Sequence, residues 1–232
     1  KSMQVGLDVR VSDMYLKALN YLEGAFCEEY RQLKENELRT KGKLLPSGLA
    51  VRYLYIVSLD KAASDRVQPS AKAYMVAKLE DRSSEYTIYE KAMIARILQA
   101  QGKKQQAEIL VHSIKEYTVT TPEMGRYFDT SKALYAWNGY RIPTQVAAME
   151  AIQQIEKDET MLNEMKHWLL KQKQVQCWST PLATADALYA LLSDGMALKE
   201  TGKMEAKGTD IRLETPDDGP GYIRQIWTGK AA

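Results

Sequence analysis

Two kinds of helical segment alternate along this sequence of 232 residues, and the alternation returns at a nearly constant interval. Segments that are rich in alanine, or apolar on nearly every side, begin near Gly48, Glu85, Pro143 and Pro181. The intervals between them are about 37, 58 and 38 residues, and the long interval contains an aromatic stretch of roughly 20 residues. Without that stretch the interval is constant, which is typical of stacked helix pairs rather than of a fold built around a central sheet.

The spacing of apolar residues predicts eight helices. We expect helices over 13–39, 49–57 and 86–101, one that begins at Pro69, one that carries Ala107, Leu110 and Ile114, and three over 144–156, 160–173 and 181–193. The segment 49–57 also fits a strand, because it is short and rich in Tyr, Ile and Val. Apolar inner helices that alternate with amphipathic outer helices predict an all-α fold, a complete or incomplete α/α toroid, with an open solenoid as the alternative.

Two stretches differ from the helical pattern. Residues 121–140 contain two short aromatic segments, 124–129 and 135–140, around a polar turn, which predicts a hairpin-like insertion. After Gly195 the chain becomes polar and rich in turn residues, and 209–214 and 221–227 alternate as strands do. We therefore expect a helical domain over 1–195, and over 196–232 a linker with the start of a β domain or a strap from it.

Charge and cysteine content argue against several classes of function. The 32 basic and 30 acidic residues leave a net charge of +2, so we expect no nucleic-acid partner. The longest apolar window, 49–59, is interrupted by Arg52 and is far shorter than the roughly 20 residues that span a bilayer, so we expect no insertion into a membrane. Two cysteines, Cys27 and Cys177, and two histidines are too few for a disulfide framework or a zinc site, so we expect no metal and no cofactor. Lys1 leads into no apolar signal segment, so we expect the chain to be an internal segment of a longer protein.

Several whole segments of the sequence carry a resemblance to a known family. They are 124–129, 135–137, 140–151, 168–173 and 178–192. Together they resemble the thioester-type α/α-toroid domain of alpha-2-macroglobulin-like proteins, in the form found in Bacteroides and related bacteria. Residues 221–224 resemble the start of the β-sandwich that follows this toroid in the family, and the similarity spans roughly 45–227.

The resemblance implies a domain of a periplasmic or outer-membrane-anchored protein of the cell envelope that entraps and inhibits proteases. Its partners would be the other domains of the same protein and the target proteases. Thioester-bearing members use a Cys-Gly-Glu-Gln motif, in which Cys and Gln condense to an acylating thioester. Here Cys27 is followed by Glu28, Glu29 and Tyr30, and Tyr30 has no carboxamide. We therefore expect no thioester at Cys27 and no catalysis by this chain.

Aromatic residues at the mouth of an inner helix form the best candidate contact surface for a neighbouring domain or a ligand. The alternative is that these rings only close one end of the toroid. The candidate residues are Tyr127, Phe128, Tyr135, Trp137, Tyr140, Arg141 and Trp178.

Two rival functions use the same architecture. A toroid-type glycosidase or lyase needs two carboxylates that face the central cavity. The inner segments offer Glu85, Glu90, Glu150 and Asp186 for that role, although none lies in a diagnostic motif. The other rival is a structural, protein-binding helical repeat.

Overall fold

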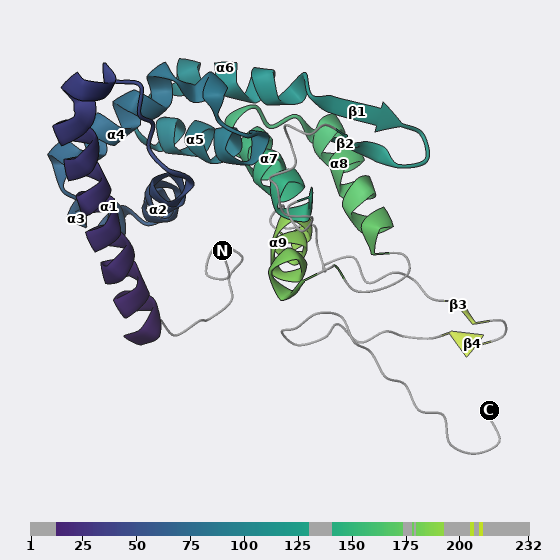
Figure 1. Ribbon diagram of the computed structural model, residues 1–232. Helices are drawn as coiled ribbons and strands as arrows, with labels where there is room; N and C mark the ends of the chain where they lie inside the picture. The colour runs from purple at the N-terminus through teal and green to yellow at the C-terminus, as the bar shows by residue number, and fades with distance from the viewer. Residues whose placement is uncertain are drawn as a thin grey trace.

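The computed structural model describes residues 13–129, 141–173, 178, 180–192, 205–206 and 209–210. Within these ranges the chain is mostly helical, which confirms the predicted all-α character (Figure 1). The helices are α1 (Asp13–Thr40), α2 (Gly48–Ser58), α3 (Lys61–Arg66), α4 (Pro69–Asp81), α5 (Ile88–Ala100), α6 (Lys104–Lys115), α7 (Arg141–Ile155), α8 (Glu159–Gln172) and α9 (Pro181–Leu192). The segment 49–57 is helical, so the strand alternative is wrong.

Capping groups explain where several helices begin. Thr87 and Glu90 form a capping box at the start of α5, in which each side chain accepts a hydrogen bond from the other residue's backbone N–H. Asp158 accepts from the Met161 N–H at 3.1 Å at the start of α8, and Thr180 accepts from the Ala183 N–H at 3.0 Å at the start of α9.

The helices form two layers. The inner helices follow one another in space, because α5 lies between α2 and α7, and α7 lies between α5 and α9. The outer helices cover them: α1 packs on α2, α4 on α5, α6 on α5 and α7, and α8 on α7 and α9. From α1 to α9 the array follows an arc (Figure 1). The predicted alternation of inner and outer helices is therefore present in the structure.

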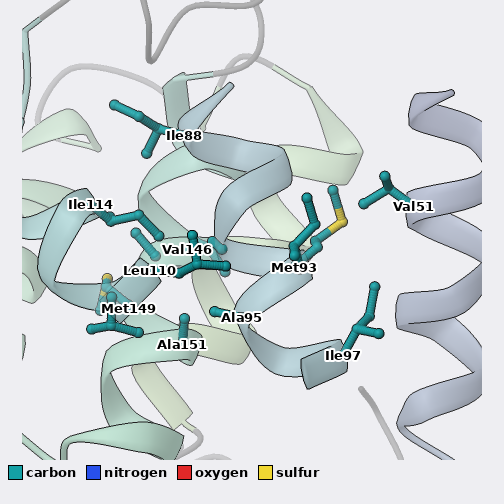
Figure 2. Packing of buried hydrophobic residues seen from close by; sticks show 14 of the residues in the cluster. Val51, Ile88, Met93, Ala95, Ile97, Leu110, Ile114, Val146, Met149 and Ala151 are labelled. Atoms are coloured by element: carbon teal, nitrogen blue, oxygen red, sulfur yellow. The ribbon is translucent and has the colours of Figure 1, made fainter. Parts of the chain in front are cut away.

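The core lies between the two layers and along the contacts of the inner helices. Figure 2 shows Met93 and Ile97 of α5 pointing toward Val51 of α2, while Ala95 points toward α7, where Ala151 lies. All five side chains are buried. Alanine at the α5–α7 contact lets the two backbones approach closely, as the alanine-rich inner segments predict.

The β-hairpin differs from the predicted one in its strand partner. Strand β2 (Gly125–Phe128) falls within the expected segment 124–129, but it pairs with β1 (Thr118–Thr121), which directly follows α6. The expected partner, 135–140, lies outside the described residues. Pairing across the short turn 122–124 is reached with little loss of chain entropy, and Gly125, with φ +75°, supplies the left-handed residue of that turn.

Three further findings concern the short elements and the tail. Helix α3 is not among the expected helices, because its six residues carry no apolar stripe; the turn η2 (Ser83–Glu85) is shorter still. In the tail, β3 (Glu205–Ala206) pairs with β4 (Thr209–Asp210), whereas 211–232, with the second predicted strand segment, lies outside the described residues. The predicted domain boundary near 195 also falls outside them. None of the described helices is long and apolar enough to cross a bilayer.

Candidate functional site on the inner helices

A polar cluster interrupts the apolar inner layer. Its centre is Glu150 of α7, whose side chain is 4% exposed. The Tyr55 hydroxyl of α2 donates a hydrogen bond of 2.5 Å to Glu150 Oε2, and Arg96 Nε of α5 lies 3.5 Å from Glu150 Oε1. A buried carboxylate is tolerated where it is paired in this way, because the opposite charge and the hydroxyl replace the water it has lost.

The cluster continues toward α9 through a small cavity. Glu150, Lys166 of α8 and Tyr189 of α9 line this cavity together with Gln153 and apolar side chains. Its volume is about 10 Å³, which is room for a single water molecule. The cavity is thus much too small for a sugar ring.

Burial shifts the pKa values of the groups around Glu150. The pKa of Tyr189 is raised to about 12, mainly by burial and further by the negative charge of Glu150. The same two causes hold the pKa of Tyr55 far above its ordinary value, so its hydroxyl stays protonated and donates. Burial lowers the pKa of the Lys166 ammonium. Among the described residues, Glu150 is the only carboxylate that lines the cavity.

The cluster residues occupy equivalent places in the four inner helices. Tyr55 is the eighth residue of α2, Arg96 and Tyr189 are the ninth residues of α5 and α9, and Glu150 is the tenth residue of α7. Of these four residues, only Glu150 is among the candidates predicted from the sequence, as one of four acids. These helices carry other polar residues as well, such as Arg52, Lys91 and Gln145, so the sequence does not single out the members of the cluster.

The other three candidate carboxylates do not join Glu150 at this cavity. Glu85 forms an ion pair with Arg82 at the surface. Glu90 is buried, but its carboxylate closes the capping box of α5 and accepts from Thr87 Oγ1 at 2.7 Å. Asp186 is half-buried on α9. The two facing carboxylates that a glycosidase requires are therefore not brought together at this cavity.

The described members of the predicted aromatic surface take part in packing. Tyr127 stacks on Trp168 of α8, with ring centroids 6.0 Å apart and planes 11° apart, and Phe128 is buried. Trp178 is also buried, whereas Arg141 is half-exposed and lies 3.8 Å from Asp129. The remaining three residues of the predicted surface, Tyr135, Trp137 and Tyr140, lie outside the described residues, so this surface stays a prediction.

Polar contacts complete the attachment of the hairpin to the helices. Arg126 Nε lies 2.6 Å from Glu164 Oε2 of α8. Gln145 of α7 donates from Nε2 to the Arg126 carbonyl at 2.8 Å. The hairpin is therefore held by stacking, an ion pair and a side chain–backbone hydrogen bond. Neither Glu164 nor Gln145 is among the candidate site residues predicted from the sequence.

No group of three or more His, Cys, Asp or Glu side chains in the described ranges is arranged to hold a metal ion. His112 and His167 are both exposed, and His112 lies 3.6 Å from Glu156. Cys27 is half-buried on α1, and burial raises the pKa of its thiol, with Glu23 as a second cause. A raised thiol pKa disfavours the thiolate that would act as a nucleophile.

Comparisons of the chain with protein-family models, with curated proteins and with solved structures found no match.

Proposed function

We propose that this chain is a non-catalytic helical-repeat domain of an alpha-2-macroglobulin-like protein of the bacterial cell envelope, with a role in protease entrapment. The observation that supports a non-catalytic role best is the Glu150 cluster. Glu150 is engaged by the Tyr55 hydroxyl and by the Arg96 guanidinium, and the cavity beside it has room for one water molecule. The family assignment rests on the resemblance of the segments 124–151 and 168–192.

The curvature of the array supports the toroid as the finer architecture. Helices α2 and α7 are separated by α5, yet Tyr55 and Glu150 are in direct hydrogen-bond contact. Side chains of non-adjacent helices meet in this way on the inside of a curved layer. We infer that the arc of Figure 1 is part of a closed or nearly closed α/α ring.

Entrapment by this segment would be non-covalent. A thioester needs a thiol and a carboxamide at motif spacing, and Cys27 is followed by Tyr30 where the carboxamide would be required. The half-buried Cys27 thiol, with its raised pKa, also makes a poor nucleophile. The contribution of this domain would be its contacts with other domains and with the captured protease.

The experiment that tests this function uses the native protein from its source. A protease such as trypsin is incubated with an excess of the protein, and its activity is measured on a small chromogenic peptide and on a large protein substrate. Entrapment predicts that activity on the large substrate falls at least about tenfold while activity on the peptide persists. Undiminished activity on both substrates would contradict the proposal, and loss of both would indicate an active-site inhibitor instead.

A further inference from the structure

Helix α9 is apolar on nearly every side, but one of its apolar sides is exposed to solvent. Of its twelve residues, only Thr184, Asp186 and Tyr189 are polar. Leu182, Leu188 and Leu192 are 63%, 46% and 39% exposed. Together with Ala185, which is also exposed, they form an apolar stripe along the helix, which we call the α9 stripe.

The position of α9 in the array explains why its stripe is bare. The inner helix α5 has an inner neighbour on each side, α2 and α7, and α7 likewise lies between α5 and α9. Within the described residues, α9 has α7 on one side and α8 from the outer layer. An apolar helix of this kind is normally buried, so the α9 stripe is the place where a further inner-layer element would pack.

The repeat interval points to the element that would occupy this place. Adding the interval of 37 or 38 residues to Pro181, the start of α9, leads to residues 218–219. Directly after that point come Pro220 and a segment with four apolar residues among six, Tyr222, Ile223, Ile226 and Trp227. The two preceding inner segments, near 143 and 181, also begin with proline.

We propose that residues 222–227 dock onto the α9 stripe as a strap that covers the last inner helix. The segment belongs to the same chain, and 29 residues separate Tyr222 from Leu192 at the end of α9. A tether of this length gives an effective concentration in the millimolar range, which favours docking within the chain over pairing with a second copy. The α9 stripe and the segment 222–227 are both apolar, so removal of their leucine, isoleucine and tryptophan side chains from water would stabilise the contact.

Disulfide trapping in the full chain tests the contact directly. In a Cys27→Ala, Cys177→Ala background, Leu188→Cys is combined with Ile223→Cys or with Ile226→Cys, and mild oxidation is followed by non-reducing electrophoresis and peptide mass spectrometry. In the matched control, Leu170→Cys takes the place of Leu188→Cys; Leu170 is 53% exposed on α8. With the second cysteine at position 223 or at position 226, we expect the disulfide to position 188 to form several-fold faster than the disulfide to position 170. Equal rates at the two positions would overturn the proposal.

Thermal unfolding of full-length variants gives an independent readout. Leu188→Asp and Ile226→Asp should each lower Tm by about 2–4 °C, and the double variant should fall little further, because both changes break one contact. Leu170→Asp and Ile226→Asp should instead have additive effects. Additive effects of Leu188→Asp and Ile226→Asp, or no effect of Ile226→Asp, would overturn the proposal. So would a dimer that forms with concentration and is lost in Leu188→Asp, because a second copy would then cover the stripe.

Discussion

Gly125, at the start of β2, provides a test of how the hairpin is attached to α8. A Cβ atom placed on Gly125 would overlap the backbone oxygen of Glu164 and would lie 3.2 Å from the Cβ of His167. The backbone of a helix cannot move aside as a flexible side chain can. Gly125 also has φ +75°, a conformation that is costly for any residue with a side chain.

The chain offers a matched control for the conformational part of this effect. Gly102 follows α5 with φ +78°, but nothing lies within 4 Å of a Cβ atom placed there. Gly102→Ala should therefore cost only the left-handed strain, about 1–2 kcal/mol. Gly125→Ala should cost that strain plus the overlap with α8, about 2–5 kcal/mol in total.

The measurement is thermal and urea unfolding of the wild-type chain and both variants. Because the hairpin can detach while the helices stay folded, amide hydrogen exchange of β1 and β2 is measured alongside. We expect Gly125→Ala to lower Tm several degrees more than Gly102→Ala and to raise exchange within the hairpin. Equal effects of the two substitutions on Tm and on exchange would refute the close packing of Gly125 against α8.

Two further predictions concern protonation. Asp158 caps α8 and pairs with Lys115, whose proximity lowers the pKa of the Asp158 carboxyl, so Asp158→Ala should cost about 1 kcal/mol at pH 7. A lowered carboxyl pKa stabilises the folded state at pH values above the ordinary carboxyl range, and this stabilisation is lost as the carboxylate becomes protonated at lower pH. The Tm difference between Asp158→Ala and the wild type should therefore shrink as the pH falls below about 4. A Tm difference that stays constant down to pH 2 would contradict this cause. The raised pKa of Cys27 predicts that iodoacetamide alkylates it at pH 8 at least twofold more slowly in the folded chain than in 6 M guanidinium, as measured by peptide mass spectrometry. Faster reaction in the folded chain would indicate an activated thiol instead.

Sequence periodicity predicted most of the helices because each buries a stripe or a whole surface whose spacing follows the helical turn. Helix α1, for example, buries Phe26 and Leu33, which lie two turns apart on one side of the helix. Helix α3 has no such stripe, and it packs on α2. Periodicity describes a helix that packs along its length, so it misses a short helix of this kind.

The site could be predicted only in part, because it depends on contacts between distant residues. Glu150 stood out as an acid in an apolar segment, but its role is set by Tyr55, which is 95 residues away in the sequence. Nothing near Glu150 in the chain indicates that its partners are a phenol and a guanidinium rather than a second carboxylate. In the hairpin, likewise, the stacking of Tyr127 on Trp168 joins residues that are far apart in the sequence.

The central claim is that the Glu150 cluster joins the inner helices and does not serve catalysis. Replacing Glu150 by Gln would leave Arg96 without its counter-charge and should lower the free energy of unfolding by about 2–4 kcal/mol. Tyr55→Phe removes the hydroxyl that donates to Glu150 and should cost about 1.5–3 kcal/mol. Tyr21→Phe, at an exposed position on α1, is the control and should have no effect.

The most direct measurement is urea unfolding of the wild-type chain, Glu150→Gln, Tyr55→Phe and the double variant as one thermodynamic cycle. If the cluster is a structural joint, both single variants are destabilised, and the coupling between Tyr55 and Glu150 is at least about 1 kcal/mol. A carboxylate kept for catalysis is commonly held at a cost to stability, and its replacement then leaves the protein unchanged or more stable. A Glu150→Gln variant as stable as the wild type, or more stable, would contradict the account.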